Sequence, residues 1–195
     1  MRIRNQRGMK RKLVAFVATA MTASLLALAS PASAVTPSSP TTNRISGADR
    51  YATAVAMARS HNVVTSGIVF ASGESTADAL AASQLASATR PILLVGKDSI
   101  SASVTDFISD YKSTIAANPA TIYFMGGVEA ISAATMASLT ASITTAGDLT
   151  PPTFTRISGA DRYATAAAAA AIADGQPTTD KMIIVSGESW ADGVS

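Results

Sequence analysis

The feature that most constrains this chain is an internal repeat. Residues 44–54 read R-I-S-G-A-D-R-Y-A-T-A, and residues 156–166 repeat all eleven letters, 112 positions later. A second pair of similar segments, Ala71–Asp78 and Val185–Asp192, follows at an offset of 114. Tandem copies at a nearly constant spacing predict repeated modules that pack on one another, and such modules more often bind extended partners than carry one active site.

The first 34 residues have the parts of a secretory signal peptide. Six basic residues precede an uncharged run from Leu13 to Ala29, and Ala32-Ser33-Ala34 forms an A-x-A cleavage site. We predict a signal peptide over residues 1–34 and a mature chain that begins at Val35. An uncleaved membrane anchor is the alternative, but the run is short for a spanning helix, which needs about 20 apolar residues. Residues 35–43 are rich in Pro, Ser and Thr, which is typical of an exposed linker.

Removal of the signal peptide reverses the sign of the net charge. The full chain has 15 basic and 13 acidic residues, whereas the mature chain keeps nine basic and all 13 acidic residues, a net charge of −4. We therefore expect no nucleic-acid partner, and no membrane partner after cleavage. The chain has no cysteine, so a secreted form must be stabilised by a packed core instead of disulfides.

Short apolar segments alternate with helical patterns along residues 68–143. The expected strands are Ile68–Ala71, Pro91–Gly96 and Thr121–Met125, and the expected helices are Thr76–Ala88, Ser101–Ala117 and Ser132–Ile143. Strands that are apolar throughout and alternate with helices predict an α/β fold, with a mostly parallel sheet that helices cover on both faces.

Each copy of the repeated box fits the junction between a strand and a helix. Arg44-Ile45-Ser46 is expected to end a strand, Gly47 to make the turn, and Asp49 to cap the next helix, with the same roles 112 positions later. The spacing predicts one complete module over residues 44–155 and an incomplete second module over residues 156–195. Because the second copy stops at the counterpart of Ala81, we expect the chain to be a truncated or partial form of a longer protein.

Enzymatic chemistry has little support in the sequence. The chain has one histidine, His61, and contains neither an H-E-x-x-H nor a G-x-S-x-G motif. Glu74 and Asp78 could act as an acid and base pair in glycoside cleavage. Their spacing at a predicted helix start is better explained by capping and by the helix dipole. We therefore predict a protein that is not an enzyme and needs no cofactor or metal.

Two glycine-bearing turns are the better candidates for a binding site. Gly73-Glu74-Ser75 and Gly126-Gly127-Val128 each follow a predicted strand and precede a predicted helix. Ligands of parallel α/β proteins bind at this edge of the sheet, where backbone N–H groups suit anions. The alternative is that the glycines only permit tight turns. Arg44 and Arg50 are further candidates, although both could instead pair with helix carboxylates such as Asp49.

The ordered motifs resemble the cell wall-binding repeat 2 family of Gram-positive bacteria. The matching segments are Arg44–Ala54, Ser72–Leu80, Pro91–Gly96, Ile122–Val128 with Ser132, and Arg156–Ala166. The resemblance implies a Rossmann-like module, usually present in three tandem copies around a pseudo-threefold axis, that anchors secreted proteins noncovalently to anionic polymers of the cell wall.

The resemblance has one departure and leaves one alternative. This chain shows one full copy and the start of another, and Gly193-Val194 replaces the Ala-Leu of the motif. The expected polymer-binding residues are Arg44, Arg50, Gly73, Glu74, Ser75, Gly126 and Gly127. The alternative function is the amino-terminal part of a cell wall hydrolase (autolysin) whose catalytic domain is missing.

Overall fold

The computed structural model describes residues 42–61, 67–116, 120–144, 151–173 and 184–188. All of these except Thr42 belong to one compact unit. The predicted signal peptide, its cleavage site and residues 35–41 of the predicted linker lie outside the described residues.

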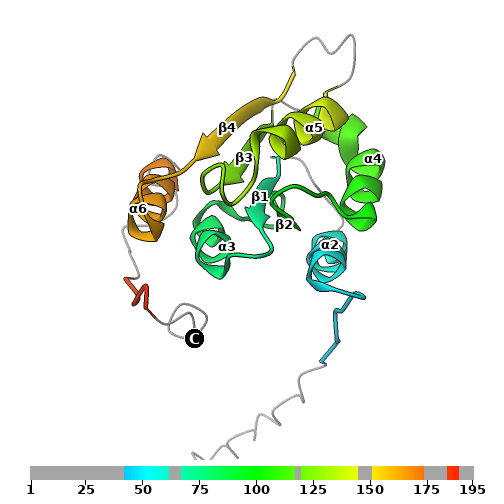
Figure 1. The fold of residues 1–195 in the computed structure, drawn as a ribbon. Coiled ribbons are helices and arrows are strands. Elements are labelled where there is room, and N and C mark those ends of the chain that lie inside the picture. The colour runs from blue at the N-terminus through cyan, green and yellow to red at the C-terminus, as the bar shows by residue number, and fades with distance from the viewer. Residues whose placement is uncertain (1–41, 62–66, 117–119, 145–150, 174–183, 189–195) are drawn as a thin grey trace, which may run out of the picture. The chain divides into compact units, whose positions relative to one another are not determined.

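The centre of the unit is a sheet whose described part has four parallel strands in the order β2-β1-β3-β4 (Figure 1). The strands span Val69–Ser72 (β1), Ile92–Val95 (β2), Thr121–Met125 (β3) and Thr153–Ile157 (β4). β1 and β3 lie in the middle, and their residues are buried almost throughout because helices cover both faces. The predicted α/β class with a parallel sheet is confirmed.

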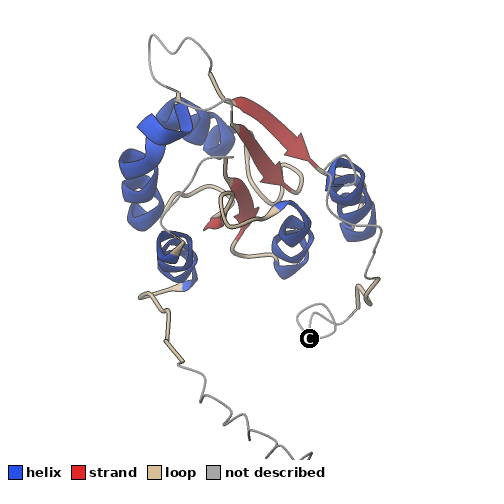
Figure 2. Cartoon of the chain, turned by 180° about the vertical axis from the view of Figure 1, so that it is seen from behind, coloured by secondary structure: helices blue, strands red, loops and turns tan. Residues whose placement is uncertain are grey.

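Among the described residues, five α-helices form the two outer layers (Figures 1 and 2). One face carries α2 (Arg50–Ser60), α4 (Ala102–Ala116) and α5 (Ala133–Ile143). The other face carries α6 (Arg162–Ala173) and α3 (Thr76–Ala82), which continues into the 3-10 turn η2 (Ser83–Leu85). In the part of the chain that the structure describes, no helix is long and apolar enough to cross a membrane.

Each face of the sheet has its own hydrophobic core. The larger core lies under α2, α4 and α5, where the rings of Phe70 and Phe124 stack with their centroids 5.2 Å apart. The smaller core lies under α3 and α6 and combines four buried alanines with Val69, Leu85, Tyr123, Met125 and Ile157. The small side chains let the two helices approach the sheet closely.

The fourth strand comes from the second copy of the repeat. β4 contains Arg156 and Ile157, pairs with β3 over its whole length, and buries Ile157 to 3% exposure. The predicted module boundary between residues 155 and 156 therefore falls inside a strand of the first sheet. This copy confirms the prediction that the R-I-S segment ends a strand.

The first copy behaves differently. Arg44-Ile45-Ser46 is exposed and is not part of a strand, so the prediction that it ends a strand is wrong for this copy. The physical reason is that a strand needs an edge to pair with, and among the described residues none lies beside this segment. The apolar segment Met182–Val185 of the second copy predicts a further strand. This segment lies partly outside the described residues, and Ile184 and Val185 are not in a strand.

Candidate functional site

The two glycine-bearing turns flank the point where the strand order reverses. The chain leaves β1 for β2 through α3 on one face, and reaches β3 through α4 on the other face. Crevices at such switch points are the usual ligand sites of open parallel sheets. Gly73-Glu74-Ser75 follows β1, and Gly126-Gly127 follows β3, so the structure brings the two predicted turns to one edge.

Half of the six backbone donors predicted at these turns are already used within the protein. The Gly73 N–H donates to the Val95 carbonyl (2.8 Å), and the Gly126 N–H donates to the Ile157 carbonyl (2.8 Å). The Glu74 N–H donates to the hydroxyl of Ser72 (3.1 Å). These three N–H groups hold the turns in place, which supports the structural explanation of Gly73 and Gly126.

Three other N–H groups of the same turns remain available. Those of Ser75, Gly127 and Val128 make no hydrogen bond to another described residue. Val128 is 56% exposed, so the tip of the turn after β3 faces solvent. Of the two turns, the one after β3 therefore presents more backbone to a ligand.

The switch point itself carries negative charge. Asp78 is half-buried in the first turn of α3, and burial raises the pKa of its carboxyl. A Cβ placed on Gly126 would lie 2.6 Å from Oδ2 of Asp78, so this carboxyl closes the gap between the turns. Glu74 was expected to cap α3, but its Oε1 instead accepts from the Lys97 N–H at 3.4 Å. Two carboxyls at this point disfavour an anionic ligand.

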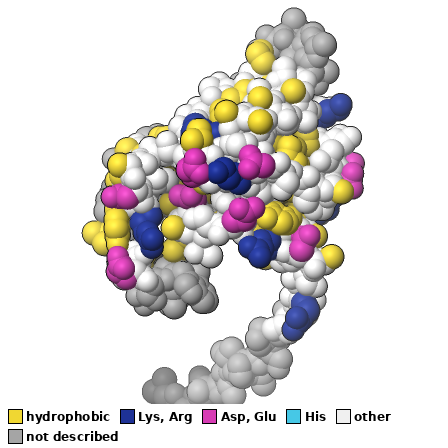
Figure 3. Space-filling view, in the orientation of Figure 1, with side chains coloured by type: hydrophobic (Ala, Val, Ile, Leu, Met, Phe, Trp, Pro, Cys, Tyr) yellow, Lys and Arg dark blue, Asp and Glu magenta, His cyan; other side chains and the backbone are white. Residues whose placement is uncertain are grey.

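Lys97 connects the loops that follow β2 and β3. Its Nζ lies 2.6 Å from Oε2 of Glu129, and this hydrogen bond raises the pKa of Lys97. Its carbonyl accepts from the Ser132 N–H (3.0 Å) and from the Thr135 hydroxyl (2.8 Å). Figure 3 shows acidic side chains gathered around a basic one on this face of the molecule. The positive charge of Lys97 is therefore partly balanced by the negative charge of Glu129.

Within each copy of the repeat, the R-I-S-G-A-D-R-Y box contacts the S-G-E turn that follows it in the sequence. Nη1 of Arg50 donates to the Gly73 carbonyl, and the ring of Tyr51 covers Gly73 so closely that a Cβ there would lie 2.5 Å from Cε1. The second copy repeats both contacts with Arg162, Tyr163 and Gly187. Arg50 thus holds the turn after β1, and neither a ligand nor Asp49 is needed to explain its presence.

The other residues of the first box are placed differently. Oδ1 of Asp49 accepts from the Ala52 N–H at 2.7 Å, which confirms the predicted cap of α2. Arg44 is exposed and makes no hydrogen bond to a described residue. The structure therefore brings Arg50 to the predicted turns but leaves Arg44 apart from any described partner.

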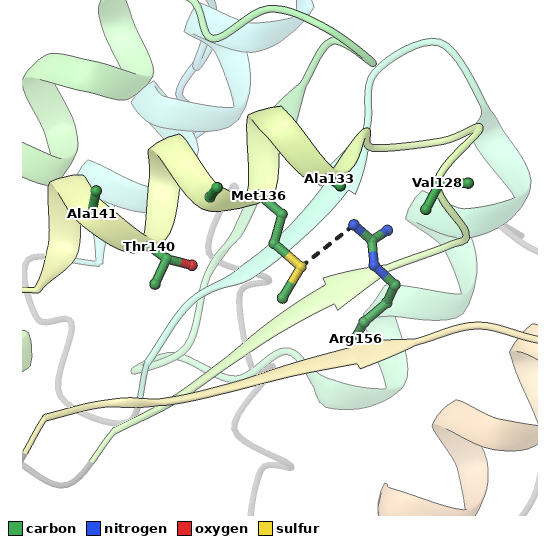
Figure 4. Close-up of a pocket in the computed structure, with 7 residues that line it drawn as sticks. Val128, Ala133, Met136, Thr140, Ala141 and Arg156 are labelled. Atoms are coloured by element: carbon green, nitrogen blue, oxygen red, sulfur yellow. Dashed lines mark hydrogen bonds between the residues drawn. The ribbon is translucent and has the colours of Figure 1, made fainter.

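A shallow groove of about 470 Å³ lies beside the turn after β3 (Figure 4). Its wall is the outer side of α5 together with one residue of β4 and one of the turn; the lining residues are Val128, Ala133, Met136, Ala137, Thr140, Ala141 and Arg156. The surface is apolar except for the Thr140 hydroxyl and the guanidinium of Arg156, which points toward Met136. The groove thus combines an apolar floor with one cation.

Arg156 is fixed in this groove by the turn after β3. Its Nη1 donates to the carbonyls of Gly126 (2.9 Å) and Gly127 (3.0 Å), and its Nη2 lies 3.4 Å from the sulfur of Met136. Burial lowers the pKa of Arg156, but a guanidinium stays charged in proteins. These contacts with described residues use three of its five N–H groups, so two remain for a ligand.

Arg156 was not among the residues predicted to bind the polymer. The internal repeat could have identified it, because Arg156 is the counterpart of Arg44, which was predicted.

Among the described residues, no three His, Asp or Glu side chains gather closely enough to hold a metal ion.

Comparison with known proteins connects this fold to the bacterial cell wall. Residues 44–136 match the family model for Cell wall binding domain 2 (CWB2). The chain is similar to the solved structure of Cwp8 from Clostridium difficile, with a TM-score of 0.53 and 27% identity over 65% of this chain and 20% of that one. Cwp6 from Clostridium difficile has the same fold, with a TM-score of 0.53 and 23% identity over 72% of this chain and 22% of that one.

The match covers only part of those proteins. This chain spans about a fifth of the length of Cwp8 and Cwp6. No curated protein matches it significantly.

Proposed function

We propose that this chain anchors a secreted protein noncovalently to the bacterial cell wall through anionic envelope polymers, because residues 44–136 match the family model for Cell wall binding domain 2 (CWB2). The match to the CWB2 family model is the observation that carries this proposal. The structural likeness to Cwp8 from Clostridium difficile supports it. In this proposal the module binds and does not catalyse, and no feature of the described residues supports the hydrolase alternative.

We place the polymer contact at the groove beside α5. The net charge of −4 in the mature chain disfavours bulk attraction to a polyanion, and the two carboxyls at the switch point repel it locally. The groove instead offers Arg156 next to the N–H groups of Gly127 and Val128. The apolar side of Met136 and the α5 alanines can pack against the carbon skeleton of a polymer unit while the cation binds its phosphate or carboxylate.

The other expected polymer-binding residues have different places in this proposal. Arg50, Gly73, Glu74 and Gly126 build the turns, because their polar groups are bonded within the protein. Ser75 and Gly127 keep an available N–H, and Arg44 is exposed. A single exposed cation contact contributes only about 0.3–1 kcal/mol, so one module binds weakly and linked modules gain through effective concentration.

The test is retention of the mature chain on purified cell walls. We expect binding to intact walls, and a loss of binding to walls from which the anionic polymer has been chemically removed. Arg156→Gln should reduce retention at least threefold, because it removes the only cation of the groove among the described residues. Arg156→Lys, which keeps the charge, should retain more than Arg156→Gln.

The matched control is Lys112→Gln, which removes the same charge from the exposed side of α4. It should leave retention unchanged, and thermal melts should show that each variant is folded. Equal retention on intact and stripped walls would rule out the polymer as the ligand. Equal loss with Lys112→Gln and Arg156→Gln would rule out the groove, because only bulk charge would then matter.

A further inference from the structure

The groove beside α5 places a thioether next to its cation. Met136 lines the groove and is partly exposed, and Nη2 of Arg156 donates to its sulfur at 3.4 Å. Figure 4 shows the two side chains turned toward each other across the floor of the groove. A thioether sulfur is a weak acceptor with two lone pairs, and this contact engages one of them. The other lone pair is left for a reagent that enters the groove.

The described methionines differ in their access to such a reagent. Met125 is fully buried in β3, and Met57 is 49% exposed on α2 but does not line the groove. Met136 is accessible and also contacts the guanidinium of Arg156. Because the chain has no cysteine, its sulfur chemistry with mild oxidants is confined to methionine.

From these observations we propose that Met136 is a site of oxidative modification, and that its sulfoxide weakens the binding of anions in the groove by competing for Arg156. The inference rests on the proposed function of the groove, and it adds a regulation of that site by peroxides. Oxidation of methionine to the sulfoxide is reversible by methionine sulfoxide reductases, so the modification does not destroy the site.

The chemical step is the transfer of one oxygen atom from a peroxide. The available lone pair of the Met136 sulfur attacks one oxygen of hydrogen peroxide, the O–O bond breaks and an S–O bond forms. The leaving hydroxide takes the proton of the transferred oxygen, so the products are the sulfoxide and water. Sulfur is oxidised and the peroxide is reduced, and no further reactant is needed.

The sulfoxide changes what Arg156 meets in the groove. Its oxygen carries partial negative charge and accepts a hydrogen bond from a guanidinium far better than a thioether does. The unbranched side chain of Met136 can turn this oxygen toward Nη2. Arg156 cannot follow a ligand away from it, because Nη1 is held by the carbonyls of Gly126 and Gly127. An anion then meets an occupied cation and a negative oxygen where the floor was apolar.

The first experiment measures access to the sulfur. The mature chain is treated with dilute hydrogen peroxide, and the gain of oxygen at each methionine is followed by peptide mass mapping. We expect Met57 and Met136 to be oxidised well before Met125. Oxidation of Met136 as slow as that of Met125 would overturn the proposal, because the sulfur would then not be accessible from the groove.

The second experiment measures retention on intact cell walls before and after the treatment. We expect the oxidised chain to lose at least about threefold in retention, and reduction by methionine sulfoxide reductase to restore it. Met57→Leu should lose as much as the unchanged chain. Met136→Leu, whatever its starting level, should not respond to the treatment. An equal loss in Met136→Leu, or full retention by a chain oxidised at Met136, would overturn the proposal.

Thermal melts before and after treatment separate a change in the groove from unfolding. We expect the oxidised chain to be folded at the temperature of the retention assay. An oxidised chain that is unfolded there would overturn the proposal, because the loss of retention would then come from the fold and not from Arg156.

A measurement without cell walls separates this inference from the proposed function. If the untreated chain does not bind walls, the proposed function is wrong, and NMR decides the present inference. The Nε–H signal of Arg156, assigned with Arg156→Gln, should shift on oxidation of the unchanged chain but not of Met136→Leu. Inorganic phosphate should move this signal about threefold more weakly after oxidation. A signal that oxidation leaves in place would show that the sulfoxide does not reach Arg156.

Discussion

Gly126 and Gly127 are neighbours in the turn after β3, but their surroundings differ. Gly126 has a φ of +92°, a backbone conformation that disfavours any residue with a side chain, and a Cβ there would also lie 2.7 Å from the Cβ of Ala130. Gly127 has neither constraint, and a Cβ placed on it would meet no atom within 4 Å. The sequence shows a pair of glycines, but only the structure shows which of them is required.

This pair gives a direct comparison of two alanine substitutions. We expect Gly126→Ala to lower the free energy of unfolding by about 1–3 kcal/mol, because it combines backbone strain with overpacking against Asp78. Gly127→Ala should change it by less than about 0.5 kcal/mol. Thermal melts of the mature chain measure both, at roughly 2–4 °C per kcal/mol. Equal melting temperatures would contradict the assigned conformation.

Asp78 should make the stability of the chain depend on pH. Burial raises the pKa of its carboxyl above the ordinary value of 3.8. Between the pKa of the unfolded chain and the higher pKa of the folded chain, the folded chain therefore binds more protons than the unfolded chain. The free energy of unfolding therefore falls as pH rises through that window. Asp78→Asn removes this fall, so the variant should be more stable than the unchanged chain at about pH 7.

Urea unfolding at two pH values checks this prediction. The stability gained by Asp78→Asn should be larger at about pH 7 than at pH 3.5, where the unchanged carboxyl is mostly protonated in both states. Asp106→Asn, on the exposed side of α4, is the control and should show no such difference. A gain that is the same at both pH values would mean that burial of the charge is not its cause.

At the scale of the elements, local patterns predicted most of what the structure shows. β3 has the predicted bounds, and α4 begins one residue after its predicted start. α5 also begins one residue after its predicted start, because Ser132 caps the helix and is not part of it. α3 is shorter than predicted because the chain tightens into a 3-10 turn, where the Ser83 hydroxyl donates to the Leu80 carbonyl at 2.6 Å. Such side-chain bonds to the backbone compete with the regular helix.

The site was harder to predict than the elements. The position of both glycine turns at the carboxyl edge follows from strand and helix alternation, and the structure places them there. The state of their N–H groups does not follow from it, because the partners Val95 and Ile157 are distant in the sequence. The groove depends on β4 reaching the sheet from the second copy, which no local pattern contains.

The alanine-rich helix α6 provides a prediction about packing. Ala169 is fully buried beside α3, whereas Ala167, two residues earlier, is exposed. Ala169→Leu should destabilise the mature chain by about 1–3 kcal/mol, because added methylenes do not fit a close helix contact. Ala167→Leu should change stability by less than about 0.5 kcal/mol. Chemical denaturation measures both, and equal effects would show that α6 does not pack closely on α3.

At the scale of the whole molecule, the first prediction concerns the mature amino terminus. The A-x-A site predicts that exported protein begins at Val35, after loss of the basic segment. Intact-mass analysis of protein recovered from the cell wall or the medium should give this start. Replacing Ala32 and Ala34 with bulky residues should block cleavage. Recovery of exported protein that begins at Met1 or Met9 would show that the segment is not a cleaved signal.

The place of β4 also has a consequence for how such genes change. The segment from one R-I-S box to the next contains four helices and three strands of the described residues, while the fourth strand of that sheet, β4, spans the boundary and ends with Arg156 and Ile157 of the next copy. Gain or loss of one such segment, from one box to the next, leaves each remaining sheet followed by the same R-I-S sequence that ends its edge strand. The repeated box, whose first two residues end β4, thus also marks a position at which the number of copies can change without breaking a domain.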